Sequence, residues 1–418
     1  VRRRWEPGFE GLSRRDRKGC FYDTYLPDPL ADWSLSLPAD LAADVADADT
    51  AVRDLNRDGT SLVSLEGLAR FLLRAESVAS SKIEGLEAGA RRLVEAEALL
   101  AQSGEKSDRL AVEILGNISS MQAAIDLADR GDELTVDDLV AIHRILMSGS
   151  SLPEIGGVVR TEQNWIGGSS YNPCSASFVP PPPEHVEDLL RDLMDYVNGD
   201  EHPALVQAAI AHAQFETIHP FADGNGRTGR ALIHVVLRRR GLATSFVPPI
   251  SLVLATWSAD YISGLTAFRH TAAADSPERS EAAQPWVRVF AAATRRGCHD
   301  AESYADRIEQ LIARWRDTVG PLRTDSAAEL LIGVLPGVPL ITVESASRLV
   351  GRSKVAASAA VNRLVDAGIL VQRNIGKQRY RVFEAPDVLD LFTALERGLA
   401  SATGDTRSDP PVRPAPGR

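Results

Sequence analysis

The chain has 418 residues, of which 44% are hydrophobic and 25% are charged, and its formal net charge is −11. This length indicates two or three domains, each large enough to bury a core without disulfides or structural metals. The acidic balance argues against a protein that binds nucleic acid over its whole surface. No apolar run approaches the roughly 18 residues of a membrane span, so we expect no membrane partner.

The three cysteines, Cys20, Cys174 and Cys298, are scattered and have no metal-ligand spacing. This pattern fits a reducing compartment. The first residues are basic but no apolar segment follows them, so no signal peptide is predicted. We therefore expect a cytoplasmic, bacterial protein.

The N-terminal part of the chain has a helical pattern. From Pro38 to about Ala128, apolar residues recur at three- and four-residue steps, which is the period of amphipathic helices. Thr135 is followed three residues later by Asp138, a capping-box pattern that opens a helix over 136–147. We assign residues 1–105 to an N-terminal helical region and residues 106–320 to a second, mainly helical domain.

The segment from Gly156 to Pro183 breaks the helical pattern with glycine pairs and a proline run. Its two short extended stretches, around Trp165 and around Phe178, predict a β-hairpin. Helices are then expected over residues 184–197, 203–217, 227–240 and 277–318.

A different pattern occupies the C-terminal region. Residues 326–383 predict helix, helix and two strands in that order, which is typical of a winged helix-turn-helix. We assign residues 321–390 to this winged-helix-like domain and residues 391–418 to a disordered tail rich in Pro, Gly and charged residues.

The winged-helix-like domain is basic within an acidic chain. Between Ile341 and Phe383, eight basic residues stand against two acidic ones, a local charge of +6. DNA binding would use the helix over 354–367 and the Gly376–Lys377 turn as a wing. Because that helix is rich in alanine, docking of a protein partner is the alternative.

The residues with chemical potential gather between His219 and Arg230, where the sequence is HPFADGNGRTGR. Part of this segment matches GxGxxG, but that fingerprint needs a preceding strand, and the alanine-rich stretch before His219 is helical. No lysine follows the glycines, so a phosphate loop of the GxxxxGK[ST] type is excluded as well.

A glycine-rich turn that opens a helix is nevertheless an anion site. Gly224 and Gly226 let the backbone approach closely, and the unpaired N–H groups of the new helix attract phosphate. Arg227 and Arg230 lie three residues apart, so we expect both on one face, where they clamp adjacent phosphoryl groups.

Two further side chains complete the candidate site. Asp223 supplies a hard oxygen ligand suited to a Mg²⁺ ion that also contacts phosphates. His219 ordinarily has a pKa near neutrality, so it can take a proton from a hydroxyl. The segment therefore predicts phosphate chemistry with a general base.

The same segment resembles the Fic/Doc motif H-x-F-x-[DE]-G-N-G-R-x-x-R, and every fixed position is matched, by His219, Phe221, Asp223, Gly224, Asn225, Gly226, Arg227 and Arg230. The resemblance implies a mainly α, helical Fic fold with a β-hairpin flap. It also implies an enzyme, a nucleotidyltransferase of the protein adenylyltransferase type. Such an enzyme uses ATP with Mg²⁺, transfers AMP to a Ser, Thr or Tyr hydroxyl of a target protein or of itself, and is commonly a homodimer.

By this resemblance His219 is the general base, Asp223 the metal ligand and Phe221 the anchor of the loop. Asn225 contacts the α-phosphate, and the other ATP-binding residues are Gly224, Gly226, Arg227 and Arg230. The hairpin around Trp165, Ile166 and Gly167 resembles the flap that docks the target by strand addition.

The stretch from Ser80 to Gly85, SSKIEG, resembles the inhibitory motif [ST]-x-x-x-E-[GN] of the family. The resemblance implies that Glu84 forms an ion pair with Arg230 in the place of the ATP γ-phosphate. The enzyme would then be autoinhibited.

Several alternatives stay open. The chain could be a DNA-binding regulator whose Fic domain is idle or modifies only itself. Glu84 could position a water so that the protein removes AMP. The donor could be another nucleotide such as UTP or CDP-choline, or ATP could be used for phosphorylation.

Overall fold

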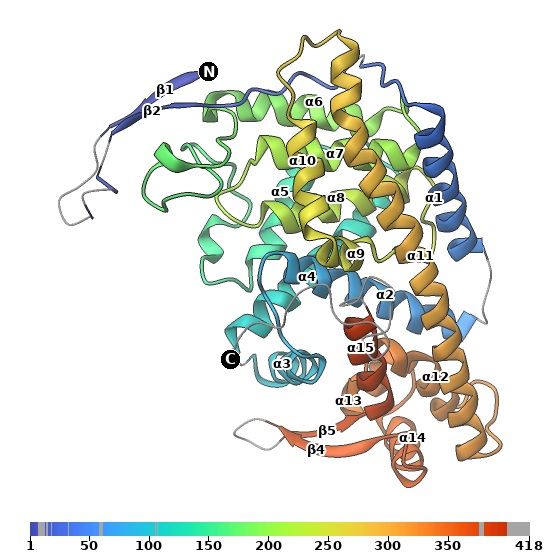
Figure 1. Ribbon diagram of the computed structural model, residues 1–418. Helices are drawn as coiled ribbons and strands as arrows, with labels where there is room; N and C mark the ends of the chain where they lie inside the picture. Colours follow the sequence, from blue (N-terminus) through green and yellow to red (C-terminus); the bar gives the residue numbers. More distant parts are fainter. Residues whose placement is uncertain are drawn as a thin grey trace.

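The computed structural model describes residues 1–6, 13, 16, 17, 19–31, 33–57, 62–104, 106, 108–375 and 380–398. Within these residues the protein is mainly helical, as the sequence predicts (Figure 1). The helices are α1 Ala39–Arg57, α2 Leu62–Ile83, α3 Ala90–Ser103, α4 Arg109–Ala128, α5 Val136–Met147, α6 Val186–Asn198, α7 Ala204–Ile218, α8 Asn225–Arg239, α9 Ile250–Thr256, α10 Ser258–Phe268, α11 Pro277–Val319, α12 Ala327–Val334, α13 Val343–Val350, α14 Lys354–Asp366 and α15 Pro386–Gly398. The strands are β1 Arg2–Trp5, β2 Cys20–Asp23, β3 Leu340–Ile341, β4 Val371–Ile375 and β5 Tyr380–Glu384. None of the described helices has the length and apolar character that crossing a bilayer requires.

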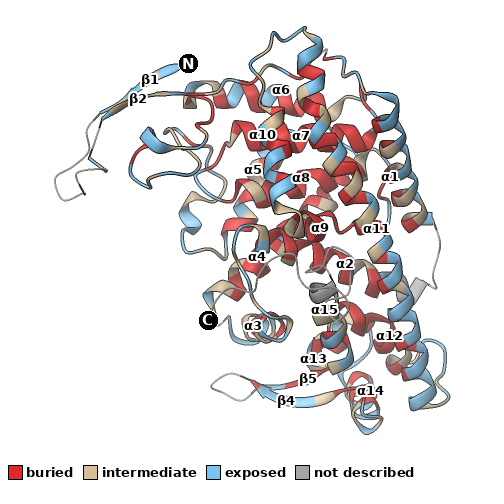
Figure 2. Cartoon of the chain, in the orientation of Figure 1, coloured by how far each residue is buried: buried red, intermediate tan, exposed pale blue. Residues whose placement is uncertain are grey.

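Helix α7 forms the centre of the fold. Each of its residues is buried (Figure 2), because its sequence is apolar around the whole circumference, as is typical of a core helix. Most of its polar side chains have hydrogen-bond partners, and Gln207, for example, donates to the main-chain oxygen of Tyr196 at 2.7 Å. A helix this well enclosed gives the residues at its C-terminal end a fixed position.

Helix α8 packs along α7, and this pair is contacted by α1, α2, α4, α5, α6, α10 and α11, whereas α3 and α12 to α15 lie towards the other end of the molecule (Figure 1). The 43-residue helix α11 runs along one side of the molecule and packs against α1 and α10. Helix α2 contacts α4, α8 and α9. The expected capping box of α5 is present, since Asp138 N–H donates to Thr135 Oγ1 and Thr135 N–H donates to the Asp138 carboxylate.

The N-terminal end differs from the expected all-helical region. Strands β1 and β2 form an antiparallel hairpin that extends away from the helical body (Figure 1). Cys20 of β2 is bonded to Cys174 in a disulfide, whereas Cys298 is a buried free thiol. The disulfide does not fit the reducing compartment inferred from cysteine usage. The chain separation of 154 residues hides the pairing from sequence spacing.

The predicted β-hairpin between Gly156 and Pro183 is reduced to a single bridge between Ile166 and Phe178. The Ile166 N–H donates to the Phe178 oxygen at 2.8 Å, and Ser177 N–H donates to the Ile166 oxygen at 2.8 Å. The chain bends at residues 167, 168 and 177, directly beside the bridge, so no longer strands form there. We call residues 164–178 the flap.

The C-terminal elements share the main hydrophobic core through contacts of α2 with α12. Their strands form a three-stranded antiparallel sheet in the order β3-β5-β4. The sequence missed β3, and the Gly376–Lys377 turn that it assigned to a wing lies outside the described residues. Helix α15 occupies residues 391–398, so the tail predicted from residue 391 is wrong for these eight residues.

Candidate active site

The loop between α7 and α8 is held from inside by Phe221 and Asn225. Phe221 is fully buried, and its ring stacks on the His143 imidazole with centroids 3.7 Å apart. Asn225 Oδ1 accepts from the Phe221 N–H at 2.9 Å, and Asn225 Nδ2 donates to the Phe221 oxygen at 2.8 Å. Both polar atoms of the Asn225 side chain are thus engaged within the loop, and the second Nδ2 hydrogen is the one left for the expected contact with an α-phosphate.

His143 supports the same loop, a role that we did not predict from the sequence. Its Nδ1 accepts from the Gly157 N–H at 2.9 Å, which leaves Nε2–H to donate to the Asp223 main-chain oxygen at 3.0 Å. Burial lowers the pKa of His143 to about 4, so the neutral ring that these two bonds require is the stable form. His143 therefore joins α5 to the start of α8.

His219 ends α7 in a left-handed conformation with φ of 50°. Its N–H donates to the Phe215 oxygen at 2.9 Å, which closes the helix. Arg160 Nε donates to the His219 oxygen at 2.8 Å, and Asn164 Nδ2 donates to the same oxygen at 3.1 Å. Residues at the edge of the flap thus fix the backbone of the predicted base.

The surroundings of His219 favour its neutral form. Burial, together with the positive charges of Arg160 and Arg269, lowers the pKa of His219 to about 4. Nδ1 has no hydrogen-bond partner among the described residues, and its nearest carboxylate oxygen, Glu216 Oε2, is 3.9 Å away. A neutral imidazole with an unused nitrogen can accept a proton.

Glu216 lies one turn before His219 on α7 and was not singled out from the sequence. Burial raises the pKa of Glu216 to about 7 in spite of the nearby Arg230, and the Glu84 charge adds to the rise. Its Oε1 has no hydrogen-bond partner among the described residues. The site therefore contains a carboxyl group that is partly protonated at neutral pH.

The turn that opens α8 is shaped for an anion. Gly224 has φ of 76°, a conformation that favours glycine, and its N–H donates to Asp223 Oδ1 at 2.6 Å. The Asp223 side chain is 57% exposed. An exposed carboxylate thus lies beside the free N–H groups of a helix N-terminus, which attract phosphate.

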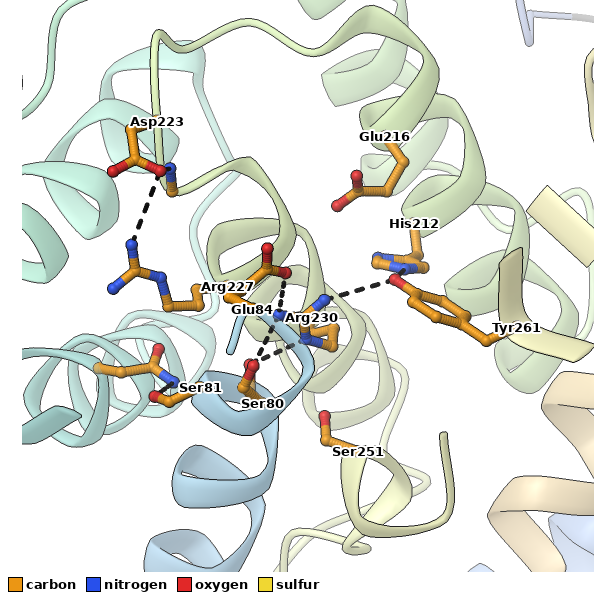
Figure 3. A network of polar contacts seen from close by, with 12 residues as sticks. Ser80, Ser81, Glu84, His212, Glu216, Asp223, Arg227, Arg230, Ser251 and Tyr261 are labelled. Atoms are coloured by element: carbon orange, nitrogen blue, oxygen red, sulfur yellow. Dashed lines mark hydrogen bonds and ion pairs between the residues drawn. The ribbon is translucent and has the colours of Figure 1, made fainter. Parts of the chain in front are cut away.

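Arg227 and Arg230 leave α8 in different directions (Figure 3). Arg227 Nη1 donates to Glu113 Oε1 on α4 at 3.0 Å, and its Nη2 lies 3.9 Å from Asp223 Oδ1. The expectation that both guanidinium groups share one face is therefore wrong. The spacing of three residues suggested it, but the acidic partners on different helices decide where each side chain points.

Arg230 is 1% exposed and turns towards α2 (Figure 3). Its Nε donates to Ser80 Oγ at 2.9 Å, and Nη2 donates to the Ser80 oxygen at 2.8 Å and to Glu84 Oε1 at 2.7 Å. On the opposite side Nη1 lies 3.4 Å from the Tyr261 hydroxyl. Burial would raise the pKa of Glu84, but the Arg230 charge and hydrogen bond outweigh burial, so that pKa is lowered.

Two glycines make the Glu84–Arg230 contact possible. Gly85 has φ of 81°, and its N–H donates to the Lys82 oxygen while Leu86 N–H donates to the Ser81 oxygen, which ends α2 in a Schellman motif. At the other side, a Cβ on Gly226 would overlap with Glu84 Oε1. Only a residue without a side chain leaves room there for the carboxylate.

The flap is tied to the N-terminal hairpin. Trp165 packs edge-on against Trp5 of β1 with centroids 5.3 Å apart, and its Nε1 donates to the Ser169 oxygen at 2.7 Å. The Cys20–Cys174 disulfide joins the same two segments. Ile166 provides the backbone bridge, and the turn after it uses Gly167 with φ of 76°.

Comparison with known proteins identifies similar sequences and folds. Residues 133–237 match the Fic/DOC family, and residues 42–126 match the Fic/DOC family N-terminal domain. The chain is 34% identical over 140 residues to protein adenylyltransferase fic-1 of Caenorhabditis elegans, covering 33% of this chain and 25% of that protein. It is 33% identical over 201 residues to protein adenylyltransferase Fic of Aedes aegypti, covering 45% of this chain and 38% of that protein.

The chain thus spans well under half the length of these curated relatives. Among solved structures, that of a Fic family protein from Desulfovibrio desulfuricans G20 aligns with a TM-score of 0.50 and 20% identity, covering 84% of this chain and 97% of that one. This likeness extends the shared fold across most of the chain.

Proposed function

We propose that this chain, which matches the Fic/DOC family over residues 133–237 and its N-terminal domain over residues 42–126, is a protein adenylyltransferase. It transfers AMP from ATP to a Ser, Thr or Tyr hydroxyl of a target protein or of itself. The observation that carries the proposal is the junction of α7 and α8, where the neutral imidazole of His219 stands beside the glycine-rich N-terminus of α8.

In this proposal the start of α8 binds the ATP phosphates. The N–H groups after Gly224 have no helical partners, and the positive end of the helix favours negative charge. His219 takes the proton of the target hydroxyl while the hydroxyl oxygen forms a bond to the α-phosphorus of ATP. The bond to the leaving pyrophosphate breaks in the same transfer, and the proton stays on the imidazole.

The residues present fit Mg²⁺ bound together with ATP. Across the part of the chain that the structure describes, no group of three or more His, Cys, Asp or Glu side chains is arranged to hold a metal by itself. Mg²⁺ is commonly held by one carboxylate together with substrate phosphates and water, and Asp223 offers that one exposed carboxylate at the anion site. When bound, the ion would neutralise phosphate charge.

We further propose that Glu84 inhibits the enzyme. Its carboxylate lies against Gly226 in the predicted phosphate site and pairs with Arg230, a residue of the predicted ATP site. A negative charge in this place repels the terminal phosphate of ATP and occupies the arginine that would bind it. Release of Glu84 would therefore permit a productive ATP pose.

Target docking and assembly remain proposals as well. The flap, with Trp165, Ile166 and Gly167, is proposed to hold the target segment through backbone hydrogen bonds. In the C-terminal elements, Lys354 of α14 pairs with Glu344 at 3.2 Å and Arg363 donates to the Val319 and Pro321 oxygens. These engaged side chains leave fewer basic groups to read DNA bases, and we propose docking of a protein partner, such as a second copy in a homodimer, for these elements.

The test uses ATP labelled either on the α- or on the γ-phosphate, with Mg²⁺, the parent protein, Glu84→Gly and His219→Ala. AMP transfer predicts label on protein from α-labelled ATP alone, more label on Glu84→Gly, and none on His219→Ala. Label from γ-labelled ATP would instead indicate phosphorylation. A salt-dependent gel shift without any label would support the DNA-binding regulator.

A further inference from the structure

Helices α2 and α8 meet at a second buried polar contact, away from the nucleotide site. Glu76 lies two turns before Glu84 along α2, and His234 lies one turn after Arg230 along α8. Glu76 Oε1 accepts from His234 Nε2 at 2.9 Å, and the two side chains are 0% and 1% exposed. The pairs run in opposite order along the two helices, Glu76 with His234 and Glu84 with Arg230, as expected for helices that pack antiparallel.

The same carboxylate also binds a third helix. Ser251 of α9 donates its N–H to Glu76 Oε2 at 2.7 Å, and its hydroxyl donates to Glu76 Oε1. Ser251 is fully buried. Glu76 thus joins α2, α8 and α9 through both of its oxygens.

A buried carboxylate is tolerated only with a full set of hydrogen bonds. Sliding α2 by one turn, about 5.4 Å, would leave the Glu76 carboxylate in the core without its donors. The contact therefore admits one register of α2 against α8. By contrast, Glu84 stands just after the last helical residue of α2 and its side chain is 38% exposed.

Resting on the proposed function, we propose that Glu76 is the positioning residue of the inhibitory helix. Its bonds to His234 and Ser251 fix α2 in the register that brings Glu84 to Arg230. Inhibition by Glu84 then depends on a buried contact of Glu76, two helical turns away from the Glu84 carboxylate.

The test measures AMP incorporation from α-labelled ATP by the full chain in a double-mutant design. The variants are Glu76→Ala, Glu76→Gln, Glu84→Gly and Glu76→Ala/Glu84→Gly. Ser77→Ala is the matched control, because Ser77 is equally buried on α2 but its hydroxyl bonds only within that helix, to the Leu73 oxygen.

We expect Glu76→Ala to raise incorporation at least about threefold through a shift towards the released state. The amide of Glu76→Gln keeps one oxygen acceptor, but its NH₂ group faces a hydrogen-bond donor of His234 or Ser251. We therefore expect a rate of incorporation between those of the parent and Glu76→Ala. Ser77→Ala should match the parent. In the Glu84→Gly background, Glu76→Ala should change nothing, whereas a merely destabilising substitution would lower the rate there too.

Hydrogen exchange keeps the test decisive if Glu76→Ala folds poorly. In Glu76→Gln, exchange of residues 80–86 should be faster than in the parent while exchange of α7 stays the same. Unchanged hydrogen exchange of residues 80–86 in Glu76→Gln would overturn this inference. So would Glu76 variants that incorporate AMP no faster than the parent while Glu84→Gly is faster, and either result would leave the enzyme assignment intact. If Glu84→Gly itself incorporates AMP no faster than the parent, the proposed inhibition by Glu84 is wrong instead.

Discussion

Glu84 and Arg230, 146 residues apart in the chain, meet with Oε1 2.7 Å from Nη2 at the junction of α2 and α8. The carboxylate reaches this position only because Gly226 has no side chain. The ion pair, the adjacent glycine and the Schellman end of α2 form one arrangement. It gives the proposed inhibition a definite steric basis.

That steric basis can be tested with Gly226→Ala in two backgrounds. In the parent the new methyl group would collide with Glu84 Oε1 and lie 2.8 Å from Arg230 Nη1, so we expect a destabilisation of about 1 kcal/mol. In Glu84→Gly the first collision is gone and the cost should be smaller. Urea unfolding of the four proteins measures the difference, and equal costs in both backgrounds would contradict the packing described.

His219 occupies a left-handed conformation that L residues rarely adopt. His219→Ala and His219→Gly both remove the imidazole, so both should abolish AMP transfer. Glycine, however, relieves the backbone strain, and we expect His219→Gly to be more stable than His219→Ala by about 1 kcal/mol. Thermal unfolding of the two variants gives the answer; an equally or more stable alanine variant would mean that the conformation is not strained.

Glu216 makes stability depend on pH. Because the folded-state pKa is raised to about 7 from an ordinary 4.5, the folded protein binds the proton more tightly than the unfolded chain. The contribution is fully present below about pH 4.5 and is lost as pH rises to 7. It is on the order of 3 kcal/mol.

The neutral variant Glu216→Gln removes this dependence. Relative to the parent, it should gain stability steadily between pH 5 and pH 7 and keep a constant difference above that range. Urea unfolding at several pH values measures the difference, and two parallel curves would show that Glu216 does not titrate as described.

The Cys20–Cys174 disulfide fastens the N-terminal hairpin to the flap. Cys20→Ser should therefore speed hydrogen exchange of residues 164–179 about tenfold or more, because the single Ile166–Phe178 bridge offers little local stability. Exchange in α7 should stay the same. Cys298→Ala is the matched control, since this free cysteine lies in α11, and an equal effect there would refute a specific role of the disulfide.

The loop between α7 and α8 could be proposed as the active site from the sequence because its features are local. A glycine-rich turn before a helix, and a histidine before it, can be recognised within twelve residues. The pairing of Glu84 with Arg230 was expected only through the family resemblance, and the geometry agrees with it. The i, i+4 series of Glu76, Ser80 and Glu84 contained a further signal, since it places three polar side chains on one helical face.

Other features depend on contacts between distant parts of the chain. Glu113 draws Arg227 away from Arg230, and neither sequence spacing nor helical periodicity reveals a partner on another helix. The disulfide likewise joins Cys20 to Cys174, 154 residues away in the chain. Helix α15 extends to Gly398. The polar composition of the residues after it led us to place the start of the tail too early, at residue 391.

AMP transfer restrained by Glu84 can be tested by intact mass spectrometry of the Glu84→Gly protein after incubation with ATP and Mg²⁺. We expect a mass increase of one or more AMP groups, larger than in the parent and absent from Glu84→Gly/His219→Ala. A Glu84→Gly protein that binds ATP as the parent does but gains no more AMP would contradict this expectation.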